Sequence, residues 1–316
     1  MKVDVLILGL ILAIAANFIG AAERDVRQTF AVQPGCTLKV DTYRGTIIVE
    51  ETDTPEVRIV VHLEIGADTE EETDRVRQAL RLEMKAENNT IFVRARNPAE
   101  SHLHFVWRDR EQIELTYRIF VPRQCKVDLV TREGKITVGN LAGRMSARTE
   151  NGTIFLRRIE GSIEAATQFG DVIVSRCSGA VTLSTLRGTI RTGTLGGFAN
   201  LKNTTGDIEA LAAGAGIVAS AEAGDVTVGF PRELAGGSKI STSGGNIYVK
   251  IDPAANCTVN ASSVWGHVRS SLSLSVDSGG NGKSRLSGRL NQGGPLITLH
   301  ASGGDVKLTP GEASFE

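Results

Sequence analysis

Glycine recurs every nine residues through the middle of the chain, and this period restricts the fold more than any other feature. The glycines in register are Gly134, Gly143, Gly152, Gly161, Gly170, Gly179, Gly188, Gly197, Gly206 and Gly224, and only position 215 interrupts the series, with Ala215. In the first five repeats, the residues two and four positions after the glycine are apolar, as Ile154 and Leu156 are. A spacing of two places such side chains on one face of a strand. Each nonamer therefore predicts a short strand with one buried face, followed by a turn.

Alternate nonamers differ in their turns, so the structural unit is a pair of nonamers. One turn carries a threonine three positions before its glycine, at Thr131, Thr149, Thr167 and Thr185, and the other carries an apolar residue two positions before, at Leu141, Ile159, Cys177 and Leu195. A repeat of this kind cannot bury its apolar face alone and must stack on its neighbours. We expect the glycines to supply positive φ or room for the next coil, and the threonines to bond turn backbone.

The sequence thus predicts a mostly β protein, a two-sided parallel β-solenoid of about 18 residues per coil, with a small α/β insert near its amino end. A right-handed coil is expected from the general preference of parallel crossovers. After Gly224 the pattern returns at Gly245, Gly266 and Gly304 with longer spacings. The coil is therefore expected to loosen toward the carboxyl end.

The insert is indicated by a broken self-match, because residues 36–49 resemble residues 125–138 position for position with other sequence between them. Within it, TEEETDRVRQAL predicts a helix over about 70–81, with Thr69 and Glu72 as a capping box. Strands are predicted in VRIVVHLEI, NTIFVRARN and EQIELTYRIFVP. The predicted organisation is a signal peptide at 1–22, a first coil at 23–50, an α/β insert or cap at 51–123, the solenoid at 124–311 and a tail at 312–316.

The first residues resemble an export signal. Lys2 precedes an apolar run from Val5 to Ile19, and small residues end at Ala22. The run is shorter than the roughly 20 apolar residues of a membrane helix and matches the apolar region of a signal peptide. We therefore expect export through the Sec pathway, with a periplasmic, cell-envelope or secreted location. An uncleaved anchor remains the alternative because Asp4 weakens the positive amino end.

The stretch VPRQCKVDLVTREGKITVGNLAG at 121–143 and the recurring T-x-x-G-x-[IV]-x-[VL] units resemble the bacterial putative-adhesin family of β-strand-repeat proteins of unknown function, which is related to the head GIN domain adhesins. The resemblance extends over roughly residues 33–309, insert included. It implies the solenoid fold and an adhesin-like role. It carries no catalytic positions onto this chain.

Three polar motifs were weighed as ligand sites, and each favours a structural interpretation. Aspartate directly follows the glycine at Asp171, Asp207, Asp225 and Asp305, whereas calcium-binding nonapeptides place it two positions after. DSGGNGKS at 277–284 ends like a phosphate-binding loop but starts with Asp277 in place of the first glycine. His102 and His104 form an isolated pair without further ligands for zinc. We expect no metal and no cofactor.

Four cysteines in an exported chain raise the question of a disulfide. Cys177 takes the place of apolar corner residues and is predicted to lie in the core. Cys36 and Cys125 stand at equivalent positions of two coils. If these coils stack directly, the two residues come within bonding range, and we predict a bridge between them.

The function predicted from the sequence is a non-enzymatic envelope or extracellular module, either an adhesin-like binding protein or a structural scaffold. Lysine and arginine number 35 against 36 acidic residues, so no net positive charge attracts nucleic acid or an anionic membrane. The predicted binding surface is a flat strand face whose outward residues Arg144, Glu164, Thr182 and Asn200 repeat from coil to coil. The expected partner is an envelope or surface protein, a polysaccharide, or another copy of the chain. The alternative is a carbohydrate-active enzyme on a β-helix, with paired acids in a cleft near the insert.

Overall fold

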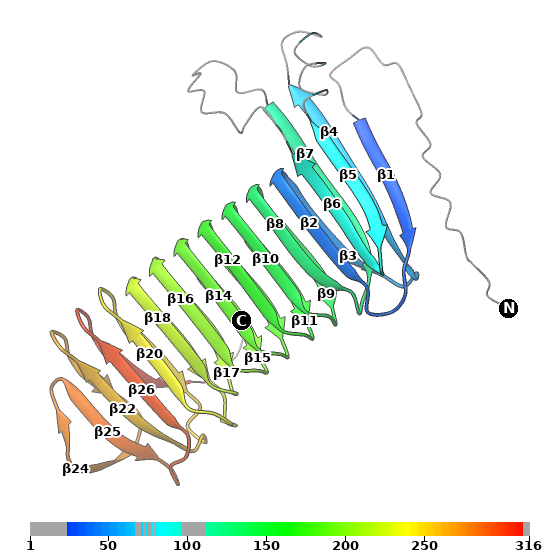
Figure 1. The fold of residues 1–316 in the computed structure, drawn as a ribbon. Helices are drawn as coiled ribbons and strands as arrows, with labels where there is room; N and C mark the ends of the chain where they lie inside the picture. Colours follow the sequence, from blue (N-terminus) through cyan, green and yellow to red (C-terminus); the bar gives the residue numbers. More distant parts are fainter. Residues whose placement is uncertain are drawn as a thin grey trace.

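The computed structural model describes residues 24–66, 71, 74, 78, 80–96 and 112–311. These residues form two sheets that run the length of the molecule, packed face to face around one apolar core (Figure 1). The chain passes from one sheet to the other at almost every turn. The fold is the two-sided parallel β-solenoid that the nine-residue period predicts.

The regular coils consist of strands that alternate between the two sheets. The 13-stranded sheet receives β3 (Thr46–Thr52), β9 (Ile136–Leu141), β11 (Ile154–Ile159), β13 (Val172–Cys177), β15 (Ile190–Leu195), β17 (Ile208–Ala213), β19 (Val226–Phe230), β21 (Ile247–Ile251), β23 (Val268–Ser270) and β27 (Val306–Pro310). The 14-stranded sheet receives β2 (Thr37–Arg44), β8 (Lys126–Glu133), β10 (Met145–Asn151), β12 (Ile163–Phe169), β14 (Val181–Arg187), β16 (Ala199–Thr205), β18 (Ile217–Ala223), β20 (Ser238–Thr242), β22 (Cys257–Ser263) and β26 (Leu296–Ala301).

Neighbouring coils are in strict register. Ile154 lies opposite Val172 in one sheet, and Ala147 lies opposite Ala165 in the other. Both positions after the glycine that were predicted to face inward are buried in all five of the first repeats. The alternation of apolar and polar residues therefore fixes which face of each strand meets the core, because a slip by one residue would turn every side chain over.

At the amino end, the insert extends both sheets. β4 (Glu56–Gly66) and β7 (Gln112–Pro122) join the 13-stranded sheet, while β5 (Arg81–Glu87) and β6 (Thr90–Arg96) join the other. β6 and β7 run parallel to β2 and β3 and so form a further coil, on which the antiparallel β4 and β5 lie. The outermost strand, β1 (Arg24–Ala31), pairs antiparallel with β4. The predicted helix lies mostly outside the described residues. Within its range, the described residues Glu71, Asp74 and Gln78 are helical.

At the carboxyl end, a hairpin closes the 14-stranded sheet. β24 (Leu274–Gly282) and β25 (Arg285–Leu290) are antiparallel, and β25 pairs with β22. The segment that ends like a phosphate-binding loop belongs to this hairpin, so it leads from one strand into another and not into a helix. No helix among the described residues is long and apolar enough to span a membrane.

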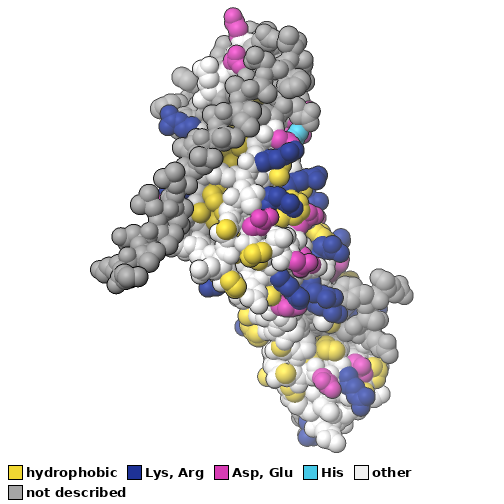
Figure 2. Space-filling model, turned by 90° about the vertical axis from the view of Figure 1, so that its right-hand side faces the viewer, with side chains coloured by type: hydrophobic (Ala, Val, Ile, Leu, Met, Phe, Trp, Pro, Cys, Tyr) yellow, Lys and Arg dark blue, Asp and Glu magenta, His cyan; other side chains and the backbone are white. Residues whose placement is uncertain are grey.

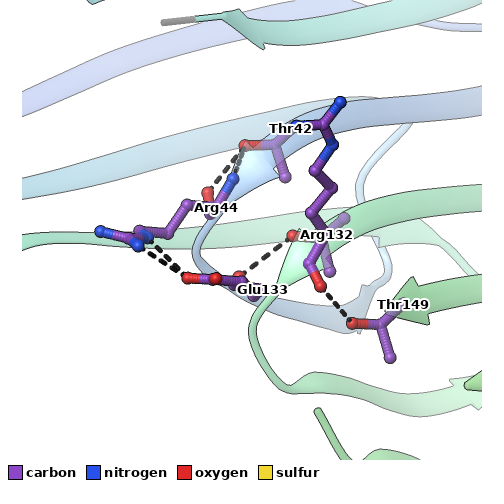
Figure 3. A network of polar contacts seen from close by, with 6 residues as sticks. Thr42, Arg44, Arg132, Glu133 and Thr149 are labelled. Atoms are coloured by element: carbon purple, nitrogen blue, oxygen red, sulfur yellow. Dashed lines mark hydrogen bonds and ion pairs between the residues drawn. The ribbon is translucent and has the colours of Figure 1, made fainter. Parts of the chain in front are cut away.

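The two corners of each coil are built differently. At the threonine corner the glycine has positive φ, as at Gly170 and Gly188 (both 145°). The hydroxyl of Thr167 donates to the carbonyl of Gly152 in the preceding coil at 3.0 Å, and Thr185 does the same to Gly170. Figure 3 shows the first of these corners, where Thr42 contacts the backbone of Arg44 and the hydroxyl of Thr149 donates to the carbonyl of Arg132. The buried threonines therefore satisfy turn backbone, as predicted.

At the other corner the glycine is required by crowding alone. A Cβ at Gly161 would overlap the carbonyl of Gly143, and one at Gly179 would stand 2.6 Å from the carbonyl oxygen of Gly161. Neither glycine is among the residues with positive φ. The corner is filled from inside by the buried apolar residue that precedes the glycine, such as Ile159.

Candidate binding surface

The aspartates that follow glycine bind backbone of the next coil. Oδ1 of Asp207 accepts a hydrogen bond from the backbone N–H of Asp225 at 2.8 Å, and Oδ1 of Asp225 accepts one from Asn246 at 2.7 Å. In the same way, Oδ1 of Asn246 accepts a hydrogen bond from the backbone N–H of Asp305, and Oδ1 of Asp305 accepts one from the backbone N–H of His267. The bond from His267 is the main cause that lowers the pKa of Asp305. These side-chain oxygens satisfy backbone amides of successive turns, so the aspartates have the structural role that the sequence favours over calcium binding.

The described residues contain no group of three or more histidine, cysteine or acidic side chains that could hold a metal ion. The predicted pair His102 and His104 lies outside them. Cys177 is buried, as its corner position predicts, and its thiol donates to the carbonyl of Gly161 at 3.2 Å.

Cys36 and Cys125 come together because their coils stack directly. Thr37 pairs with Lys126, and the Sγ atoms of the two preceding cysteines are 2.8 Å apart in the core, where both are free thiols. Their shared hydrogen bond lowers the pKa of the Cys36 thiol. The same bond, together with burial, raises the pKa of Cys125. The bridge between them remains a prediction, now with the two sulfurs in contact.

Many of the charges on the outer face of the 14-stranded sheet are paired, although the exposed cations Lys39, Arg94 and Lys202 on this face form no ion pair with any described residue. Arginines on and beside this face form ion pairs with acids of neighbouring strands, namely Arg44 with Glu133, Arg96 with Asp41, Arg132 with Glu150, and both Arg144 and Arg148 with Glu164. A shallow groove of about 800 Å³ crosses this face near the insert, and it includes Asp41 and Glu150. Each of these two carboxylates is occupied by an arginine.

The predicted outward row on this face needs one correction. Glu164, Thr182 and Asn200 lie in register across β12, β14 and β16, but the residue of β10 opposite Glu164 is Ser146, not Arg144. Arg144 is two residues earlier in the chain, so it precedes the row by one pleat. Its guanidinium reaches Glu164 diagonally at 3.3 Å.

The outer face of the 13-stranded sheet is different, because it carries apolar side chains interspersed with arginines. One straight row crosses seven strands, from β4 to β15, and consists of Val60, Arg118, Ile48, Thr137, Phe155, Ile173 and Arg191. The four apolar members are half-buried and the two arginines are exposed. Figure 2 shows how basic, acidic and hydrophobic side chains intermix along one side of the molecule.

Five arginines on this face form no ion pair with any described residue. We call them the arginine face: Arg58, Arg118, Arg157, Arg158 and Arg176. Arg158 and Arg176 lie directly opposite each other on β11 and β13. Like charges in this position destabilise a sheet. The sequence contained the signal, since these two arginines are one 18-residue repeat apart, but the arginine face was not among the predicted sites.

At the amino end the arginine face continues into a shallow pocket of about 710 Å³. It is lined by Arg58, Arg118, Val60 and Phe120, among others, and the guanidinium of Arg58 lies 4.5 Å from the centre of the Phe120 ring. The acid in this pocket, Asp25, is already engaged by His62 and Arg27, and these two hydrogen bonds lower its pKa.

The matched family model covers residues 37–309 and is described as Toastrack DUF4097. The chain belongs to the Toastrack DUF4097 family. No relative was found among curated proteins. The Toastrack chain is similar to crystal structures of bacterial proteins. A putative adhesin from Bacteroides fragilis is 12% identical, with a TM-score of 0.42, over 91% of this chain and 97% of that one.

Two further structures come from Parabacteroides distasonis. A putative adhesin is 10% identical, with a TM-score of 0.47, over 91% of this chain and 97% of that one. A putative lipid binding protein is 12% identical, with a TM-score of 0.45, over 90% of this chain and 96% of that one.

Proposed function

We propose that this Toastrack chain is a non-enzymatic, exported binding module of the cell envelope, which docks on its partner through the outer face of a sheet. Its solenoid acts as a rigid frame that presents side chains at the spacing of the coils. Export rests on the apolar run that ends before Ala22, which lies outside the described residues.

The observation that carries this proposal is the in-register pairing of the exposed residues Arg158 and Arg176 on neighbouring strands. Their strands are about 4.8 Å apart, and like charges directly opposite each other on neighbouring strands are destabilising unless an anion compensates them. On the opposite face, Arg144 and Arg148 share the acidic partner Glu164 within the chain. A face whose charges are left uncompensated is a face that an external partner can compensate.

The alternative of a carbohydrate-active enzyme needs paired acids in a cleft, one to donate and one to accept a proton or attack. The groove near the insert supplies Asp41 and Glu150, but Arg96 and Arg132 already bind them. Short turns between coils build no deeper wall among the described residues. The non-enzymatic function is therefore the better supported of the two.

The test is co-sedimentation of the purified chain with bacterial envelope fractions. The wild type should sediment with them, and the double variant Arg158→Glu/Arg176→Glu should remain in the supernatant. A matched double variant on the other face, Arg144→Glu/Arg148→Glu, changes the net charge equally and should behave like the wild type. Melting curves of all three proteins control for loss of fold.

Equal sedimentation of the two double variants would contradict docking through the 13-stranded sheet. Turnover of a polysaccharide from the same fractions, lost on substitution of Asp41 or Glu150, would instead support the enzyme.

A further inference from the structure

We propose that the arginine face binds the phosphate headgroups of an anionic phospholipid bilayer and lies flat on its surface. This inference rests on the proposed function, because it names the partner of the same sheet face. Three features of the face support it: uncompensated charge, interleaved apolar side chains, and extent.

The arginines are placed so that phosphate oxygens can accept hydrogen bonds from two guanidinium groups at once. Arg158 and Arg176 stand on neighbouring strands without acidic partners among the described residues, and Arg157 is exposed beside them. A guanidinium presents a planar fork of donors that binds phosphate through two parallel hydrogen bonds. A headgroup phosphate between the two forks would remove their repulsion and satisfy both.

The apolar side chains favour a lipid surface over a purely polar polyanion. Phe155 and Ile173 are adjacent in the outward row and half-exposed, and Ile48 and Val60 continue the row toward the amino end. Phe120 lies under Arg58. Surfaces that bind a bilayer interface combine basic residues for anionic lipids with aromatic and aliphatic residues that enter the headgroup boundary.

The extent of the face suits a planar partner. The outward row crosses seven strands, which corresponds to about 29 Å at about 4.8 Å per strand. The acids on this face include Glu50, which is opposite Phe120, and Glu51, which accepts a hydrogen bond from Asn140. Toward the amino end, the exposed Glu64 and Glu114 lie opposite each other on β4 and β7. Glu209 is paired with Arg191. Glu50 has no cationic partner among the described residues and opposes binding, so removing its charge should strengthen the interaction.

The experiment measures binding to vesicles of phosphatidylcholine with and without phosphatidylglycerol. The wild type should bind only the vesicles that contain phosphatidylglycerol, and binding should weaken as salt is added. Arg158→Gln/Arg176→Gln should bind about 30-fold more weakly, since each basic residue near an anionic surface contributes a factor of about five. Arg144→Gln/Arg148→Gln removes the same charge from the other face and should retain the wild-type affinity.

Two further variants separate the roles within the face. Glu50→Gln should bind severalfold more tightly, because it removes a repulsive charge. Phe155→Ser/Ile173→Ser should weaken binding without changing its dependence on salt, because it removes apolar contacts and no charge.

Equal binding by the two arginine double variants would overturn the inference, since attraction would then follow net charge and not the face. Absence of wild-type binding to phosphatidylglycerol vesicles, together with face-dependent binding to envelope fractions or a soluble anionic polysaccharide, would overturn the lipid partner and leave the proposed function intact. Absence of face-dependent binding to vesicles and envelope fractions alike would overturn both.

Discussion

The two corners of each coil solve the same problem in different ways. Both bring successive turns so close that a Cβ would overlap the carbonyl of the coil before, as at Gly170 and Gly161. The threonine corner adds positive φ and a buried hydroxyl that donates to that carbonyl. The apolar corner adds neither and relies on a buried aliphatic residue. A glycine period of nine therefore contains two structural requirements, which alternate along the chain.

The largest effect should come from alanine at a threonine-corner glycine. Gly170→Ala combines the overlap with Gly152 and a φ of 145° that side chains rarely adopt, so we expect a loss of about 3–5 kcal/mol in unfolding free energy. Gly161→Ala meets the overlap without the strained φ and should lose about 1–3 kcal/mol. Urea unfolding measures both.

The control for these variants is Gly282→Ala, where an added Cβ has nothing within 4 Å and the change should stay within about 0.5 kcal/mol. Equal losses at Gly170 and Gly161 would mean that crowding alone explains the glycine period.

The second prediction concerns the coils of β2 and β8, where cysteines stand at the apolar corner in place of its glycine. Lys126 lies opposite Arg144, so Cys125 occupies the position of Gly143, with Cys36 one coil further out. A disulfide here would replace the hydrogen bond between the two thiols by a covalent bond. We expect two free thiols per unfolded, exported chain instead of four, and a loss of about 2–4 kcal/mol on reduction.

The matched control is the Cys36→Ala/Cys125→Ala variant, which lacks the bridge. Its unfolding free energy should be the same with and without reductant. Four free thiols in the exported protein before reduction would show that the pair is not bridged.

The smallest of the three effects should follow loss of a corner hydroxyl. Thr167→Val keeps the volume but leaves the Gly152 carbonyl without the hydroxyl that donates to it, which should cost about 1–3 kcal/mol. Thr182→Val removes an exposed hydroxyl from the next strand of the same sheet and should cost less than about 0.5 kcal/mol. Thermal unfolding of the two variants checks the difference, and equal melting temperatures would argue against a structural role for the buried threonines.

Much of the fold was predictable because each coil repeats the same inward apolar positions and the same corner residues. The inward positions, the two corners and the strands of the insert at β4, β6 and β7 follow from period and turn chemistry. β1 and β5 were missed. Each is held by antiparallel pairing with a strand of the insert, β1 with β4 and β5 with β6, and neither contains the glycine that marks a coil. Such pairing depends on which strand arrives alongside, and local sequence does not encode it.

The candidate site was less accessible from sequence. The 18-residue period identifies residues that share a position on successive coils, yet it does not show whether an outward charge will have a partner of opposite charge. Glu164 on a neighbouring strand forms an ion pair with Arg148, whereas the residue opposite Arg158 is another arginine, Arg176. Both outcomes depend on side chains from different coils.

The sequence by itself determined the coil: its length, its inward face and the alternation of its corners, because these depend on residues close together in the chain. The tertiary structure alone decided which coils stack next to each other. Cys36 meets Cys125 only because β2 packs directly on β8, with the insert folded to the far side of β2. The same stacking leaves five arginines on one face without acidic partners among the described residues, because the charges of neighbouring side chains are brought together between coils and not within them.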